Sequence, residues 1–208
     1  MIIDMHIHQK MNSSDSKLDL FEAIEVAKQR GLDGICITDH DDLGLRPMAQ
    51  TISTETGFPV YVGVEIFTLD GDLLCFGIDE MPQERLSAQE TIDYVNDRGG
   101  VTIAAHPYRH NNRGLGDHIA RVSGLGAVEA FNGRTDALSN MKARNIALDL
   151  DLPQSGGSDS HTDTEVGNFA TEFTVPVNSE ADLVSAIRQG HIRPVTVMGL
   201  EMNNIETA

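Results

Sequence analysis

Five short clusters of histidine and acidic residues hold the groups in this 208-residue sequence that could do chemistry. Each cluster lies at or just past the carboxyl end of an apolar, strand-like run. The clusters are residues 4–8 (DMHIH), 38–41 (TDHD), 63–65 (GVE), 105–107 (AHP) and 157–161 (GSDSH). Imidazole and carboxylate groups are ligands of divalent metals, and they outnumber the roughly four ligands that one zinc ion takes. The sequence therefore predicts a multinuclear metal site and an enzyme.

The first cluster has the spacing of a chelate on a strand. Side chains alternate along a strand, so Asp4, His6 and His8 share one face and the apolar residues between them share the other. Two histidines on one face can bind the same ion. Asp4 is expected to orient an imidazole rather than to bind metal.

The other clusters add ligands of the same kind. His40 is flanked by two carboxylates, and Glu65 has two oxygens that could bridge two ions. His106 precedes a proline, which restricts the chain as it leaves its strand. Asp159 and His161 repeat the two-residue spacing of the first cluster.

The elements that must position these clusters alternate between strands and helices. Hydrophobic periodicity predicts helices over residues 18–30, 46–56, 88–98, 116–122, 138–148 and 180–189. It predicts strands or short apolar runs over residues 2–7, 34–38, 60–67, 73–77, 101–105, 127–131, 153–156, 169–175 and 194–198, with 73–77 as a hairpin partner.

This alternation predicts an α/β fold with a mostly parallel sheet and helices outside. No linker divides the chain, so residues 1–208 are expected to form one domain. Because ligand clusters follow so many different strands, we expect the strands to close into a barrel with the metal site at its C-terminal mouth. No glycine-rich dinucleotide or P-loop motif follows the first strand.

Composition restricts the partners and the compartment. The chain has 32 acidic residues against 15 Lys and Arg, a net charge of -17, and such a charge repels extended nucleic acid. Cys36 and Cys75 are too few for a disulfide framework, and no stretch has the pattern of a membrane span or a signal peptide. We expect a soluble, cytoplasmic protein. The sequence does not indicate an oligomeric state.

Taken jointly, the motifs resemble those of the polymerase and histidinol phosphatase (PHP) superfamily of metal-dependent phosphoesterases, in family order from residue 4 to residue 161. The resemblance implies a distorted seven-stranded (βα) barrel with two to three divalent ions, such as zinc, manganese or iron. It implies a first ion bound by His6, His8, Glu65 and Asp159, a second shared by Glu65 and held by His106, and a third held by His40 and His161.

Two positions depart from the family pattern. The third ion usually takes a further ligand soon after the first motif, where this sequence offers Asp15. The second ion often takes a histidine from a GHLL-like segment, where this sequence has Asp72 in Gly-Asp-Leu-Leu. Asp72 could coordinate through oxygen and favour a harder ion such as manganese, or it could be a turn residue only.

The resemblance also implies a function. Metal ions would activate water for attack on a phosphate ester and neutralise phosphoryl charge. The expected catalytic residues are Asp159, His161 and Glu65, and the expected substrate-binding residues are Arg109, His110 and Arg134. No long insertion covers the site, so the expected partner is a small phosphorylated substrate, a nucleotide or related phosphomonoester or short diester. The alternatives are a histidinol-phosphate-type phosphatase, a 3′–5′ exonuclease and a non-catalytic metal-binding module.

Overall fold

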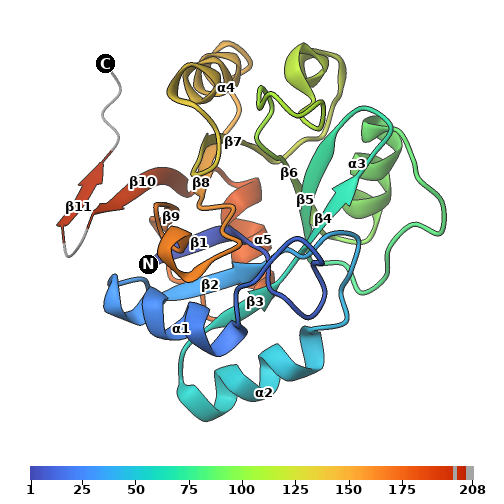
Figure 1. Ribbon diagram of the computed structural model, residues 1–208. Coiled ribbons are helices and arrows are strands. Elements are labelled where there is room, and N and C mark those ends of the chain that lie inside the picture. The colour runs from blue at the N-terminus through green and yellow to red at the C-terminus, as the bar shows by residue number, and fades with distance from the viewer. Residues whose placement is uncertain (199–200, 205–208) are drawn as a thin grey trace.

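The computed structural model describes residues 1–198 and 201–204 and has the predicted alternation of strands and helices (Figure 1). The helices are α1 (Leu20–Gln29), α2 (Arg46–Thr56), α3 (Ala88–Asp97), α4 (Ala137–Asp149) and α5 (Glu180–Arg188), with 3-10 helices η1 (Gly116–Arg121) and η2 (Asp163–Glu165). The strands are β1 (Ile2–Ile7), β2 (Gly34–Ile37), β3 (Val60–Val62), β4 (Val64–Phe67), β5 (Asp72–Phe76), β6 (Val101–Ala104), β7 (Ala127–Asn132), β8 (Gln154–Gly157), β9 (Phe169–Phe173), β10 (Ile192–Met198) and β11 (Glu201–Asn204).

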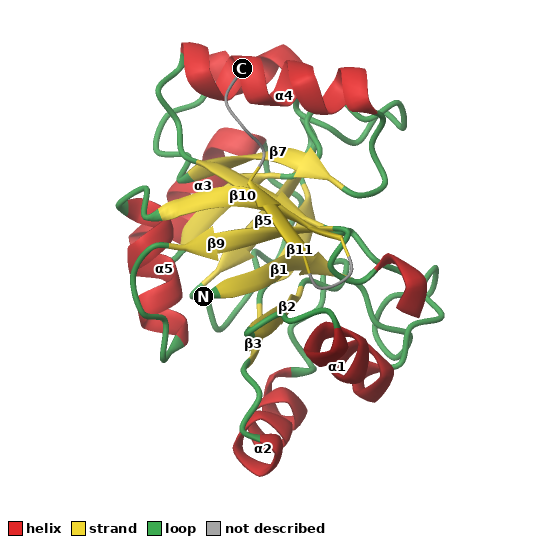
Figure 2. Ribbon diagram, turned by 90° about the vertical axis from the view of Figure 1, so that its left-hand side faces the viewer, coloured by secondary structure: helices red, strands yellow, loops and turns green. Residues whose placement is uncertain are grey.

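The strands form two hydrogen-bonded sheets. One has the order β11-β10-β9-β1-β2-β3 and the other the order β4-β5-β6-β7-β8. Figure 2 shows the strands in the middle of the molecule, with α4 on one side and α1 and α2 on the opposite side. The α/β fold is confirmed, whereas closure into one seven-stranded barrel stays a prediction.

The predicted mostly parallel sheet is wrong in part. Strands β1, β2 and β3 pair in parallel, as do β6, β7 and β8. Strand β5 is antiparallel to both of its neighbours, and β9 is antiparallel to β1 and to β10. The short link from β4 to β5 is the predicted hairpin, and such a link is too short for the crossover that a parallel pair requires.

The predicted strand over residues 60–67 is divided at Gly63, where the chain passes from one sheet to the other. A Cβ atom at this position would lie 2.5 Å from the ring of Phe76 and 2.8 Å from the carbonyl oxygen of Cys75. Only glycine permits so close an approach. The break therefore places Glu65 at the start of the second sheet.

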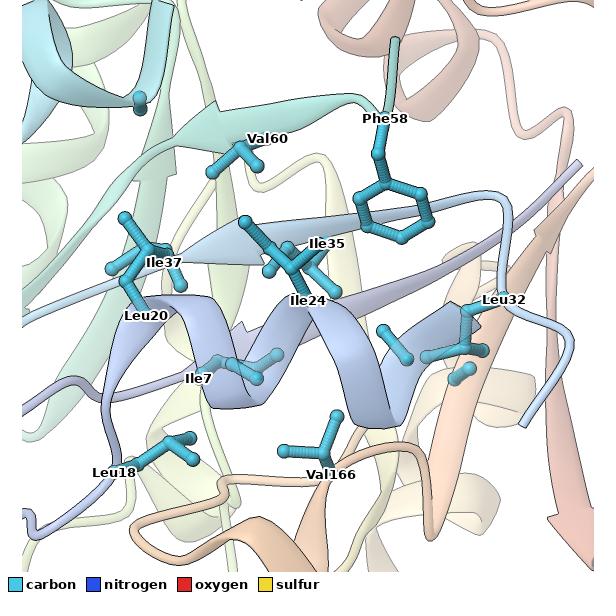
Figure 3. Packing of buried hydrophobic residues seen from close by; sticks show 14 of the residues in the cluster. Ile7, Leu18, Leu20, Ile24, Leu32, Ile35, Ile37, Phe58, Val60 and Val166 are labelled. Carbon is cyan, nitrogen blue, oxygen red and sulfur yellow. The ribbon is translucent and has the colours of Figure 1, made fainter. Parts of the chain in front are cut away.

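Helix α1 shows why the apolar positions predict the packing. Asp19 caps its first turn by accepting a hydrogen bond from the backbone N–H of Phe21 at 2.9 Å. Leu20 and Ile24 then share the face that packs on Ile35 and Ile37 of β2, as Figure 3 shows. This buried layer packs against β2, the strand that precedes His40.

The two sheets are joined by hydrogen bonds at the end where the candidate site lies. The backbone N–H of His8 donates to the carbonyl oxygen of Ser160 at 2.9 Å, across the border between β1 and β8. At the other border, the N–H of Glu65 donates to Asp39 at 3.1 Å and the N–H of Asp41 donates to Glu65 at 3.0 Å. Both borders therefore run through residues next to predicted ligands.

No helix among the described residues is long and apolar enough to cross a membrane.

Candidate metal centre

His6 and His8 lie on one side of β1 as the alternation predicts. Both are fully buried, and their Nε2 atoms are 3.0 Å apart. Ligand atoms bound to one transition metal at 2.0–2.2 Å lie about 3–4 Å from each other, so this separation fits a shared ion.

Asp4 has a different role from the one predicted. Its carboxylate accepts hydrogen bonds from the backbone N–H groups of His6, Ser158 and Gly167, so it holds the backbone and not an imidazole. Burial raises the pKa of Asp4 to about 6. Glu129 of β7 is the residue that orients His6, with its Oε1 atom 2.9 Å from His6 Nδ1.

Glu65 lies at the centre of the histidines. One carboxylate oxygen is 2.8 Å from His106 Nε2 and 3.6 Å from His6 Nε2. The other is 2.8 Å from His40 Nδ1 and 3.4 Å from His8 Nε2. Each oxygen thus faces a different pair of imidazoles, as a bridging carboxylate requires.

Asp159 and His161 follow β8, where the chain approaches β1 closely. Asp159 Oδ1 lies 3.4 Å from His8 Nε2 and 3.7 Å from His6 Nε2. A Cβ atom at Gly157 would lie 2.6 Å from the Cβ of His6, so only glycine leaves the imidazole its place. Asp159 itself has a φ of 53°, in the left-handed region that few non-glycine residues adopt.

Asp15 joins His40 and His161 at the outer side of the cluster. Its Oδ2 atom lies 3.1 Å from His161 Nε2 and 3.4 Å from His40 Nε2. His8, His40 and His161 also offer three nitrogen atoms within 4.8 Å of one another. The loop after β1 therefore brings Asp15 where the resemblance requires a further ligand.

Asp72 and His106 lie at the side of the cluster opposite Asp15. Asp72 Oδ2 is 3.8 Å from His106 Nε2, and both residues group with Glu65. His106 has a φ of 28°, so this strand end also leaves its sheet in a left-handed conformation. Both oxygens of Asp72 accept hydrogen bonds from Arg113, a contact that the sequence did not predict.

Two of the three predicted substrate-binding residues line a pocket at the candidate metal centre, and the third does not. Arg109 and Arg134 line a small pocket of about 130 Å³ together with three histidines and four acidic residues of the cluster, which are His40, His106, His161, Asp15, Glu65, Asp72 and Asp159. Arg109 Nη1 donates to Asp159 Oδ2 at 2.6 Å. His110 is not brought to this pocket: its side chain is 82% exposed and lies 3.8 Å from Asp136.

The cluster balances buried negative and positive groups. Burial alone would raise the pKa of Glu65, but His6, His106 and His40 hold the pKa well below its usual range. Burial also opposes ionisation of Asp159, yet His6 and His8 lower its pKa. His8, in contrast, is largely desolvated and its pKa falls to about 4, so it is neutral at neutral pH and free to give a lone pair to a metal.

The sequence missed Glu129, Asn132 and Arg113. Glu129 Oε2 accepts from the backbone N–H of His106 at 2.7 Å and from Asn132 Nδ2 at 3.1 Å. Asn132 Nδ2 also lies 3.2 Å from Asp159 Oδ2. A glutamate inside the apolar run 127–131 was a signal in the sequence, since an acidic side chain in a buried strand requires a partner.

Nitrogen and oxygen donors grouped at buried strand ends of an α/β fold form a candidate metal site of the kind that metal-dependent hydrolases use. The chain belongs to the PHP family. The sequence profile of the PHP domain matches residues 4–132, and that of the PHP-associated region matches residues 137–192. The predicted family and the predicted enzyme class are confirmed by this membership.

One protein of known sequence and two solved structures resemble this chain. An uncharacterized protein of Methanocaldococcus jannaschii is 32% identical over 164 residues, which cover 74% of this chain and 95% of that protein. PsfC from Pseudomonas syringae has a TM-score of 0.72 at 20% identity, covering 94% of this chain and 91% of its own. A candidate metal-dependent phosphoesterase from Bifidobacterium adolescentis has a TM-score of 0.64 at 21% identity, covering 76% and 87%.

A lesion-specific endonuclease from Pyrococcus furiosus has a TM-score of 0.65 at 17% identity, covering 90% of this chain and 56% of its own. At these identities the solved structures show that the fold is shared.

Proposed function

We propose that this chain hydrolyses a phosphate ester of a small substrate, a nucleotide or related phosphomonoester or short diester, with water activated by divalent ions. The observation that carries the proposal is Glu65, a buried carboxylate within 2.8–3.6 Å of four imidazoles from three strand ends. This donor set of nitrogen and oxygen suits zinc, manganese or iron.

Two ligand groups fit an ion best. The first consists of His6, His8, Glu65 and Asp159, whose facing atoms are 3.0–3.7 Å apart. The other consists of Asp15, His40 and His161, with His8 beside them. Divalent ions at such sites lower the pKa of water and neutralise phosphoryl charge.

The residues around the ligands supply orientation and proton transfer. Arg109 holds Asp159 Oδ2, which leaves Oδ1 facing His6 and His8. His161 donates through Nδ1 to the carbonyl oxygen of Asp159 at 2.9 Å, and its Nε2 faces the pocket, 3.1 Å from Asp15 Oδ2. We propose that Asp159 takes the proton of the attacking water, while His161 supplies Nε2 as a ligand and Glu65 fixes the ligands around the water.

The pocket favours a small anionic substrate. At about 130 Å³ it is below the roughly 300–1,000 Å³ of sites that enclose a whole small molecule, so it encloses a phosphoryl group and leaves the rest of the substrate outside. Arg109 and Arg134 give it local positive charge within a chain of net charge -17. Extended nucleic acid is not a proposed partner.

Two wider proposals accompany this function. Strands β1 to β8, with β3 and β4 counted as one, would form the distorted seven-stranded barrel, since bridges at Ile7–Ser160 and His40–Glu65 connect the sheets at both borders. We also infer a soluble, cytoplasmic protein in which residues 1–208 act as a single domain.

The test combines metal analysis with a substrate panel. Protein purified without chelator is analysed for transition metals and then assayed with nucleotides, bisphosphorylated nucleosides, histidinol phosphate and short oligonucleotides. We expect about two to three ions per chain and hydrolysis of one of the small esters. Metal without turnover on any substrate would favour the non-catalytic module, and no metal even after reconstitution would refute the site.

A further inference from the structure

Asp72 and Arg113 form a buried ion pair at one side of the metal centre. The guanidinium donates from Nε to Asp72 Oδ2 at 2.7 Å and from Nη2 to Oδ1 at 3.0 Å. The Asp72 side chain is completely buried, and that of Arg113 is 32% exposed. Such a two-point contact fixes a carboxylate in one orientation.

The pair is built into the backbone as well. The N–H of Asp72 donates to the carbonyl oxygen of Arg113 at 2.6 Å. A Cβ atom at Gly71 would lie 2.7 Å from the backbone nitrogen of Leu115 and 2.9 Å from the oxygen of Arg113. The guanidinium also lies 4.4 Å from the ring centre of Phe67. Arg113 is therefore a positioned residue and not a freely moving loop side chain.

Asp72 is also the residue that would complete the second ligand group, with Glu65 and His106. The oxygen that faces His106, Oδ2, is the one that accepts the shorter bond from Arg113. An ion there would lie next to a guanidinium that cannot lose its proton. Two cations in so buried a place repel each other strongly, so they compete for one carboxylate.

His106 supplies an independent observation. A histidine that binds metal usually donates its second ring N–H to a partner that orients the ring. His6 has Glu129 in this role, and His161 has the carbonyl oxygen of Asp159. His106 Nδ1 is buried and has no hydrogen-bond partner among the residues that the structure describes. Its ring therefore lacks the orienting hydrogen bond that His6 and His161 have, although His40 Nδ1 is also without such a partner among the described residues.

We propose that Arg113 takes the place of the second metal ion, so that the chain binds tight ions only at the two groups built on His6–His8 and on His40–His161. The inference rests on the proposed function, which requires those two groups to bind metal. Arg113 lines the pocket with His106 and Arg109, and its fixed charge would meet an oxygen of an anionic substrate where the ion would otherwise lie.

Metal stoichiometry tests this without any activity assay. Wild type and Arg113→Gln are purified without chelator, loaded with manganese or zinc, desalted and analysed for metal. We expect about two ions per chain in wild type and about one more in Arg113→Gln, because the released Asp72 becomes a ligand. In Arg113→Gln combined with Asp72→Ala the count should return to that of wild type.

The matched control is Arg134→Gln, which removes a positive charge from the same pocket but not from Asp72. Its metal count should equal that of wild type. If Arg113→Gln does not fold, Asp72→Asn replaces it, and the count should again equal that of wild type.

Equal counts in wild type and folded Arg113→Gln would overturn the inference while leaving the proposed function standing. Loss of an ion in Asp72→Asn would overturn it as well, because Asp72 would then be a ligand. A wild type that binds no ion under any condition would overturn the proposed function and this inference together.

Discussion

At the scale of single residues, the centre is an alternation of imidazoles and carboxylates that neutralise one another. Glu65 faces four histidines, and Asp159 faces His6 and His8. An ionised carboxylate is costly inside a protein unless it is paired or bound to metal. The same contacts that make the charges tolerable also set the donor atoms at ligand distances.

Removing Glu65 should harm the centre more than removing one histidine. Glu65→Ala deletes the group that faces every imidazole pair, whereas His6→Ala deletes one ligand. Both variants should lose nearly all hydrolase activity and keep their fold by circular dichroism. Metal content should fall further in Glu65→Ala. Wild-type metal content in folded Glu65→Ala would exclude a bridging role.

Glu129 should act on metal affinity through the residues that it orients. It accepts from the N–H of His106 and from Asn132, and it lies 2.9 Å from His6 Nδ1. Glu129→Gln puts an amide N–H₂ group among these donors and should weaken metal binding about 10–100-fold, measured by calorimetry. The control is Glu172→Gln, which removes a carboxylate of β9 that is paired with Arg193. Equal affinities in the two variants would contradict this role.

The grouping of the candidate ligands could be predicted from the sequence because it depends on local rules. Alternation along β1 places His6 and His8 together, and strand ends of one fold meet at one edge. Arg113 and Asn132 could not be predicted in this way, because their contacts join segments that only the packing of loops brings together. The place of His110 outside the pocket has the same cause: its side chain is exposed and lies 3.8 Å from Asp136.

At the scale of elements, helices followed the sequence more closely than sheet pairing did. Helix α3 begins directly after its N-cap residue Ser87, which forms a capping box with Glu90. It ends within one residue of its predicted bound. Helix periods and caps are local signals. The antiparallel placement of β9 and the sheet change at Gly63 depend on contacts between distant strands, so periodicity carried no sign of either.

Gly63→Ala should destabilise the fold. The added methyl group would lie 2.5 Å from Phe76 and 2.8 Å from a backbone oxygen, so strands β4 and β5 would have to move apart. Overpacking of this kind costs about 1–3 kcal/mol of unfolding free energy. Urea titration measures it as a lower midpoint at unchanged slope. A midpoint equal to that of wild type would contradict this, because it would show that β4 and β5 accommodate the methyl group without cost.

At the scale of the whole molecule, the net charge of -17 opposes compaction, and four of the 32 acidic residues line the pocket of the candidate metal centre. Bound divalent ions would neutralise some of that charge in the folded state only. Folding and metal binding should therefore be coupled.

Chelation should lower the thermal midpoint. Ions at about a hundredfold excess over their dissociation constant stabilise a fold by about 2.7 kcal/mol, which corresponds to about 5–10 °C for a chain of this size. Scanning calorimetry before and after removal of metal measures the shift, with metal-saturated chelator as the control for ionic strength. An unchanged midpoint after verified removal would contradict the coupling.

The hydrogen-bonded borders between the two sheets give three backbone amides a reporting role. The N–H groups of His8, Asp41 and Glu65 cross those borders, each within two residues of a ligand side chain. When ions tie the side chains together, opening of either border requires the release of metal. Hydrogen–deuterium exchange at these amides should then slow on loading, while amides inside α3, which crosses neither border, keep their rate. Bound ions would therefore hold both borders closed.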